Sequence, residues 1–212
     1  MLYRLGILCG LFAPLLWASA IILCGSLTPG YSHAAQYVSE LGARGSSTEL
    51  LIRYSGFVPT GLMHMAFAAS LYVAFRGNKL ASVAAALLAL NGLGRVGAGL
   101  FPCEPGCSVP RVLLSQKLHS AASGVGFFAL IGAAILWGIA LRRGGRLKGL
   151  RLYSIASGLL GLVFLLLMSW SDELRAATGL YERLSSGVLS TWVFVMAARL
   201  WYLRPYATED AG

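Results

Sequence analysis

Residues that could do chemistry are few in this chain, and each interrupts a long apolar run. His119 and Ser123 are four residues apart, which places them on one face of a helix. We predict His119 as a general acid–base residue, with Glu40 and Asp172 as further catalytic residues near it. The guanidinium of Arg95 is suited to hold a phosphate or carboxylate. Together these residues predict a site for an anionic substrate.

Ionisable residues inside apolar segments are costly, so they mark functional sites by default. We predict that the substrate-binding residues are Arg95, Asn91, His64, Ser123, Glu182 and Ser186. Either Glu40 or Glu182 is the expected counter-ion for Arg95. The structural alternative is that these side chains only hydrogen-bond across helices, and that the serines only satisfy backbone carbonyls.

Metal chemistry is a second interpretation of the polar residues. The three histidines, His33, His64 and His119, together with Asp172, have the side chains of a zinc site with an activated water. Two histidines could also hold a haem axially. No nucleotide-binding fingerprint, P-loop or two-histidine zincin motif occurs in the sequence, so the cofactor is left unknown.

The elements that carry these residues read as membrane helices. Of 212 residues, 57% are hydrophobic and 12% are charged, whereas a soluble domain has about 25% charged residues. The sequence therefore predicts an all-α, polytopic six-helix bundle of a single domain over residues 1–212, with outer loops at 27–53, 101–112 and 171–183. The six predicted spans are Leu5 to Ser26, Tyr54 to Phe75, Leu80 to Leu100, Leu113 to Leu141, Leu152 to Trp170, and Leu184 to Leu203.

The basic residues predict the orientation of the bundle. If the spans alternate in direction, one side carries most of the positive charge: Arg4, Arg76, Lys79, Arg142, Arg143, Arg146, Lys148, Arg151, Arg199 and Arg204. By the positive-inside rule this side, with both termini, is cytoplasmic. The net charge of +9 is explained in this way, and nucleic-acid binding is not expected. The expected location is a prokaryotic cytoplasmic (inner) membrane.

Two outer segments are expected to be ordered. Residues Tyr31 to Gly45 form the longest polar interruption, and we predict a short helix from Ala34 to Leu41 that caps the cavity and brings Glu40 to Arg95. In the next outer loop, Cys103 and Cys107 are predicted to form a disulfide, and metal binding is the alternative.

Several of these motifs resemble one known family. They are Ser39-Glu-Leu-Gly-Ala-Arg-Gly45, the glycine-rich Gly97-Ala-Gly-Leu-Phe-Pro102, and Leu118-His119. In order and spacing the chain resembles the bacterial and archaeal six-helix membrane family catalogued as domain of unknown function 998. The resemblance implies the fold and topology and assigns no activity.

We therefore expect an integral membrane protein that binds or remodels a lipid or other amphiphile in an outward-facing polar cavity. The first alternative is a metal-dependent intramembrane hydrolase that uses the histidines. The second is a non-enzymatic scaffold or accessory subunit that packs against partners through its glycine-rich helix faces. Membrane lipid is the expected partner, and no protein partner is predicted.

Overall fold

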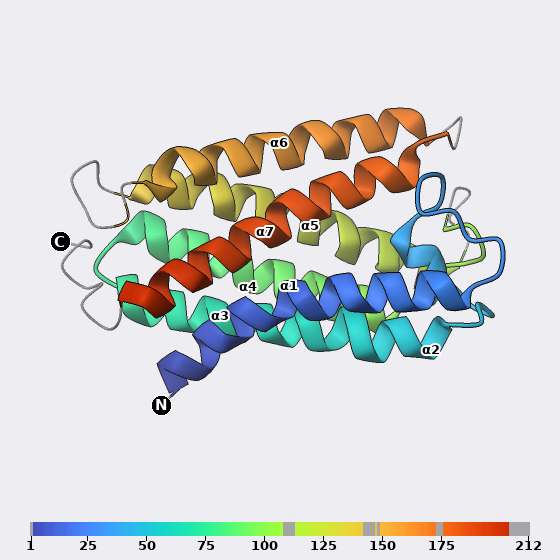
Figure 1. Cartoon of the computed structure of the whole chain (residues 1–212), viewed down its shortest axis with the longest axis horizontal. Coiled ribbons are helices and arrows are strands. Elements are labelled where there is room, and N and C mark those ends of the chain that lie inside the picture. The colour runs from blue at the N-terminus through green and yellow to red at the C-terminus, as the bar shows by residue number, and fades with distance from the viewer. Residues whose placement is uncertain (1, 108–112, 142–146, 148, 173–175, 204–212) are drawn as a thin grey trace.

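A computed structural model describes residues 2–107, 113–141, 147, 149–172 and 176–203, and all regular structure in this part of the chain is helical. Six helical segments are long and apolar enough to cross a membrane (Figure 1). They are α1 (Leu2–Leu27), the segment Glu49–Phe75, α4 (Lys79–Leu100), α5 (Leu114–Ala140), α6 (Leu150–Ser171) and α7 (Thr178–Leu203). The all-helical, six-span prediction is confirmed.

The second and sixth spans begin earlier than hydropathy predicts. The second starts at Glu49 instead of Tyr54, and the sixth at Thr178 instead of Leu184. Each added turn carries two charged residues, Glu49 and Arg53 in one and Glu182 and Arg183 in the other, so a hydropathy profile counts them as loop although their backbone is helical. The connection between the first two spans therefore covers residues 28–48, and the one between the last two spans is much shorter than the predicted 171–183.

The second span consists of three consecutive segments: α2 (Glu49–Leu51), the π-helix η2 (Ile52–Phe57) and α3 (Val58–Phe75). Pro59, in the first turn of α3, has no N–H to donate to the preceding turn. The wider π-helical turn lies directly before this proline, as expected where the regular hydrogen-bond ladder is interrupted.

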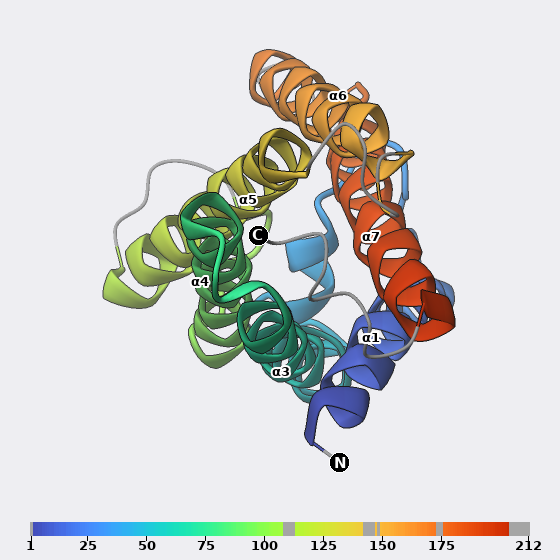
Figure 2. The same cartoon turned by 90° about the vertical axis from the view of Figure 1, so that its left-hand side faces the viewer.

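The spans form a closed ring (Figure 2). Around it, α1 packs against α3, α3 against α4, α4 against α5, α5 against α6, α6 against α7, and α7 against α1. Small residues bring neighbouring helices close together: a Cβ on Gly61 would lie 2.5 Å from the Gly92 carbonyl oxygen, and the reverse distance is the same. The ring places residues from all six spans around one interior space.

The two halves of the ring interior differ. Where α1 begins and α7 ends, a large apolar cluster that includes Phe67, Trp137, Trp192 and Met196 fills the interior. Towards the opposite end the apolar cluster is smaller and lies around Trp17, beneath the 28–48 segment. The polar residues singled out from the sequence therefore belong to the less densely filled half.

Charge is also divided between the two ends. Arg4, Arg76, Lys79, Arg151 and Arg199 belong to helix ends where α1 begins and α7 ends. The acidic residues that the structure describes all belong to the half with the 28–48 segment: Glu40, Glu49, Glu104, Asp172 and Glu182. Arg142, Arg143, Arg146, Lys148 and Arg204 lie outside the described residues.

Candidate functional site

The 28–48 segment is folded over one end of the ring, and we call it the cap. Val38 and Leu41 are almost fully buried in the cluster around Trp17. Its helix is the 3-10 helix η1 (Val38–Gly42), shorter than the predicted Ala34 to Leu41. The Glu40 carboxylate accepts hydrogen bonds from Tyr37 N (3.0 Å) and Gln36 Nε2 (2.9 Å). Glu40 therefore stabilises the turn that begins this helix.

Hydrogen bonds to α7 hold the cap in place. Val38 N donates to Glu182 Oε2 over 2.6 Å, and Leu180 N donates to the Ala34 carbonyl over 2.8 Å. The Tyr31 hydroxyl donates to the Tyr37 carbonyl (2.8 Å) and accepts from the Arg183 guanidinium. Burial raises the pKa of Tyr31 to about 12, so this hydroxyl stays protonated at neutral pH.

The loop after α4 closes the other side of this end. Cys103 and Cys107 are joined by a disulfide, with their Cα atoms 5.2 Å apart. Fully buried Gln116 accepts from Glu104 N (2.6 Å) and donates to the Cys107 carbonyl (3.2 Å). Arg44 N donates to the Cys103 carbonyl over 2.9 Å, which links this loop to the cap.

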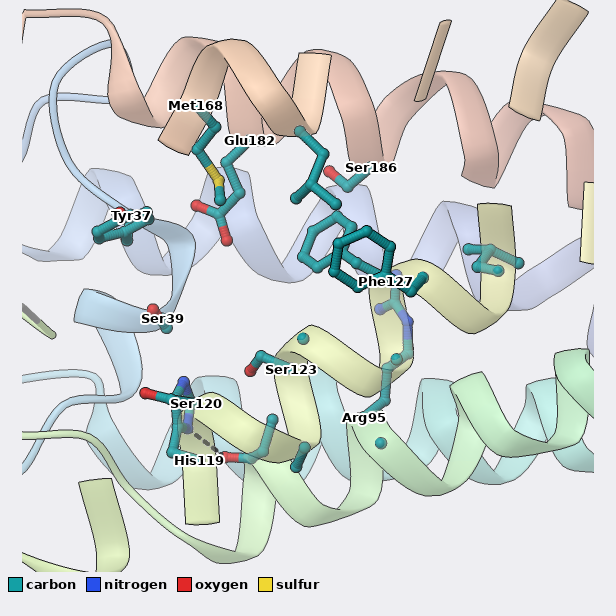
Figure 3. Close-up of a pocket in the computed structure, with 18 of the residues that line it drawn as sticks. Tyr37, Ser39, Arg95, His119, Ser120, Ser123, Phe127, Met168, Glu182 and Ser186 are labelled. Carbon is teal, nitrogen blue, oxygen red and sulfur yellow. Dashed lines mark hydrogen bonds between the residues drawn. The ribbon is translucent and has the colours of Figure 1, made fainter. Parts of the chain in front are cut away.

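A cavity of about 250 Å³ lies inside the ring below the cap. Residues from the cap and from all six spans line it. Figure 3 shows several of them. Among its polar lining residues are Arg95, His119, Ser120, Ser123, Asn91, Ser169, Asp172, Glu182, Ser186, Tyr37 and Ser39. Of the nine residues predicted as catalytic or substrate-binding, only Glu40 and His64 are not part of this lining.

Arg95 has few protein partners for a guanidinium within a membrane helix. Its Nη1 donates to Thr60 Oγ1 over 3.3 Å, and its Cζ lies 4.5 Å from the centre of the Trp17 ring. Thr60 in turn donates to the Gly56 carbonyl (2.7 Å), which leaves its lone pairs for Arg95. A guanidinium has five N–H donors, so most of those on Arg95 have no hydrogen-bond partner among the described residues.

The predicted contact between Glu40 and Arg95 is absent from the described residues. Glu40 is held in its own turn of the cap, whereas Arg95 belongs to α4 inside the ring. Glu182 projects into the cavity from α7, on the opposite side from Arg95 (Figure 3). The two do not come within the 4 Å of an ion pair. The cavity thus has a cationic side and a carboxyl side.

His119 is fixed through one ring nitrogen. Its Nδ1 lies 3.0 Å from the carbonyl of Ala98, in the last turn of α4, and 2.8 Å from the carbonyl of Phe101, the residue that follows α4 (Figure 3). Carbonyl oxygens only accept, so Nδ1 carries a proton and donates. In the neutral ring, Nε2 then has the lone pair, and it has no hydrogen-bond partner among the described residues. This arrangement suits a general base.

His64 does not line the cavity, and its predicted role in substrate binding stays a prediction. It is 1% exposed, and its Nδ1 lies 2.6 Å from Asn91 Oδ1. Asn91 Nδ2 donates onward to the Gly126 carbonyl over 2.9 Å. This chain of hydrogen bonds joins α3, α4 and α5. Asn91 belongs to both this chain and the cavity lining.

The serines and Asp172 lie at the cavity as predicted. Ser123 and Ser186 line it from α5 and α7 (Figure 3). The Ser186 hydroxyl also donates to the Arg183 carbonyl (3.4 Å), the local bond expected of a helical serine. Asp172 lines the cavity at the end of α6. Their proximity to a substrate stays a prediction.

The histidines do not gather into a metal site. Among the described residues, no group of three or more His, Cys, Asp or Glu side chains could hold a metal ion. His64 is bonded to Asn91, and the His33 ring lies against α1 at Gly25. This donor set does not fit zinc, which takes at least three protein ligands, so the metal-dependent alternative has no support.

Sequence reasoning missed three residues that shape the site. Trp17 stacks on Arg95, Thr60 is the hydrogen-bond partner of Arg95, and Gln116 holds the disulfide loop. For Trp17 one signal was available. Tryptophan is enriched at membrane interfaces, and Trp17 lies in the interior of a span.

Comparison of the chain with curated proteins and with solved structures finds no significant match in either group. A family model does match, over residues 11–199, and its description is protein of unknown function (DUF998). The matched range includes most of the first and last spans, the four spans between them, the cap and every residue that lines the cavity. The chain is an integral membrane protein that belongs to the DUF998 family.

Proposed function

We propose that this membrane protein binds an amphiphile with an anionic headgroup, and that the headgroup lies in the cavity against Arg95. The observation that carries the proposal is the guanidinium itself. Arg95 lines the cavity and makes one hydrogen bond to the described protein residues. Arginine is well suited to phosphate and carboxylate because its planar fork of donors matches their oxygens.

The other cavity groups support a headgroup that also carries hydroxyl or ammonium groups. Glu182, Ser123 and Ser186 supply oxygen atoms around the same space. Glu182 Oε2 accepts from Val38 N, so the carboxyl is held in one position, and its second oxygen is available to a ligand donor.

The proposed location is a prokaryotic cytoplasmic membrane, with the basic end of the bundle in the cytoplasm and the cap outside. Its support is the positive-inside rule, since the charged residues described at helix ends away from the cap are all basic, whereas the cap half mixes basic residues with all the described acidic ones. The disulfide between Cys103 and Cys107 fits the oxidising side of such a membrane. The cavity would then receive amphiphiles from the outer leaflet.

Binding to purified full-length protein in nanodiscs of neutral lipid tests the proposal. Palmitoyl lysophosphatidate is the probe, and the uncharged palmitoyl monoacylglycerol is the comparison. Arg95→Gln is expected to weaken lysophosphatidate binding about ten- to a hundredfold, because a hydrogen bond to a charged group contributes roughly 1.5–3 kcal/mol. Lys117→Gln removes one exposed positive charge at the same end of the bundle and serves as the matched control.

The control variant is expected to bind like the original protein. Equal affinity for the charged and uncharged lipids would contradict the proposal, and so would an Arg95→Gln protein that keeps full affinity.

Remodelling of the bound lipid is a second candidate function, and the fixed ring of His119 favours it. Nε2 could take a proton from a water molecule whose oxygen attacks a lipid ester carbonyl, and return it to the alcohol as the ester C–O bond breaks. The products would be an acid and an alcohol. Incubation with ester lipids should release fatty acid, and His119→Gln should abolish release while lipid binding remains. If no ester lipid releases fatty acid, hydrolysis is rejected and lipid binding is the only proposed function that stands.

A further inference from the structure

The central cavity is too small for a whole amphiphile. Its volume of about 250 Å³ lies below the roughly 300–1,000 Å³ of typical small-molecule sites. If the headgroup lies against Arg95 as proposed above, the acyl chain must lie elsewhere. A second hollow lies beside the cavity, and it is apolar.

This hollow is a groove of about 570 Å³ between α1 and α7. Pro14, Ile21 and Ile22 line it from α1, and Gly187 and Phe194 line it from α7. Gly187 is exposed, and a Cβ at this position would meet nothing within 4 Å. The groove is thus an open apolar channel along the outer surface of two membrane-spanning helices.

Two residues, Trp17 and Ser186, line both the groove and the cavity. They form the wall between the two spaces. Figure 3 shows Ser186 on the α7 side of the cavity, near Glu182. Arg95 contacts this wall, because its guanidinium lies on the Trp17 ring. A headgroup at Arg95 therefore lies directly behind the groove.

The Trp17 indole provides an independent sign of a ligand. The residue is 7% exposed, and its Nε1 is buried with no hydrogen-bond partner in the part of the chain that the structure describes. A buried polar group without a partner costs about 1–3 kcal/mol, so such groups call for an explanation. An ester or phosphate oxygen at the junction of groove and cavity would accept from this N–H.

We infer that the α1–α7 groove binds the acyl chain of the same amphiphile whose anionic headgroup lies in the cavity, so that the lipid crosses the wall at Trp17 and Ser186. The inference rests on the proposed function. It commits the ligand to a lipid with an anionic headgroup and a long chain, rather than a free phosphate compound. Entry is then lateral, from the bilayer between α1 and α7.

Two glycines allow the two spaces to be blocked separately. Gly187 lies in the groove and Gly124 in the cavity, and a Cβ at either meets nothing within 4 Å. Both lie inside helices, where replacing glycine by leucine improves helix propensity. Gly149→Leu adds the same side chain at the other end of the bundle, also into open space, and is the control.

The experiment measures binding of palmitoyl lysophosphatidate and of glycerol 3-phosphate to the full chain. Gly187→Leu is expected to weaken binding of palmitoyl lysophosphatidate at least about tenfold. The added side chain would exclude roughly two methylene groups of the acyl chain from the groove, and their lost burial accounts for this factor. Gly187→Leu should leave the affinity for glycerol 3-phosphate unchanged, whereas Gly124→Leu should weaken the binding of both ligands. Gly149→Leu should weaken neither.

The outcomes separate the two proposals. If Gly187→Leu binds the lipid like the original protein, the chain does not use the groove, although the headgroup site can stand. If the original protein binds neither ligand, the proposed function fails and the inference with it. A lysophosphatidate with a photoreactive diazirine at the chain end gives a second measurement. It should label residues 14–22 or 187–194. Labelling confined to α3–α5 would contradict the inference that the acyl chain binds in the α1–α7 groove.

Discussion

The hydrogen-bonded chain of His64, Asn91 and Gly126 should stabilise the protein without contributing to ligand binding through His64. Asn91→Leu would leave His64 Nδ1–H buried without its 2.6 Å partner and remove the 2.9 Å bond to the Gly126 carbonyl. An unsatisfied buried donor costs about 1–3 kcal/mol. Interhelical hydrogen bonds in membranes average nearer 0.6 kcal/mol, with a maximum near 1.7. We therefore expect Asn91→Leu to lower the free energy of unfolding by about 1–3 kcal/mol.

A double-mutant cycle isolates the bond between the two side chains. His64→Leu alone leaves Asn91 Oδ1 unsatisfied, while the double variant removes both polar groups together. The double variant should therefore be less destabilised than the sum of the single variants, by about 0.6–1.7 kcal/mol. Steric trapping or denaturant unfolding in micelles measures these values. Leu93→Ala, on the lipid-exposed face of the same helix, is the control.

Additive effects in this cycle would show that the two side chains do not interact, and the proposed contribution of their hydrogen bond to stability would be refuted. His64→Leu is also expected to keep the affinity for palmitoyl lysophosphatidate, since His64 does not line the cavity. If a stable His64→Leu protein selectively loses affinity for the lipid, His64 does contribute to ligand binding.

Three further predictions concern the cap and the orientation. Cys103→Ser should lower stability by about 2 kcal/mol, the loop-closure effect of a short disulfide loop, and reduction of the original protein should match it in thermal unfolding. Arg53→Met should cost about 1–3 kcal/mol, because Arg53 binds Glu49 (2.7 Å) and the last carbonyls of α4; adding Glu49→Gln should restore part of the loss. Alkaline phosphatase fused after Leu203 should be inactive and a fluorescent protein there active, and the reverse result would invert the proposed topology.

The spans could be predicted from sequence, because hydrophobicity alone identifies them. The charged turns that begin the second and sixth spans could not be predicted as helical in this way. Helix ends such as Glu49 and Thr178 depend on backbone hydrogen bonding that tertiary contacts stabilise, and hydropathy does not measure this. Arg95 and His119 were singled out because ionisable residues inside apolar segments are costly. Both do line the cavity.

Side-chain partners could not be predicted, because they depend on how each helix is rotated about its axis. Trp17 and Arg95 are on helices that are not neighbours in sequence, and nothing local indicates that they stack. The histidines show the same limit: His64 turned towards Asn91, while His33 turned towards α1. By contrast, the contacts of Glu40 with Tyr37 and Gln36 are local, and the glutamate three residues after Tyr37 is a capping pattern that could have shown them.

Arg95 is the residue at which stability and binding should oppose each other. An arginine inside a membrane helix costs about 2.5–3.5 kcal/mol, while stacking on Trp17 returns roughly 0.5–2 kcal/mol and one hydrogen bond about 1 kcal/mol. Without a ligand, Arg95→Met should therefore be as stable as the original protein or more so. At a concentration of lysophosphatidate about a hundred times the dissociation constant of the original protein, that protein should gain about 2.7 kcal/mol. A variant that binds ten- to a hundredfold more weakly should gain only about 0.4–1.4 kcal/mol. If Arg95→Met instead unfolds more easily without ligand, the guanidinium serves the fold, and the anion site at this position is refuted.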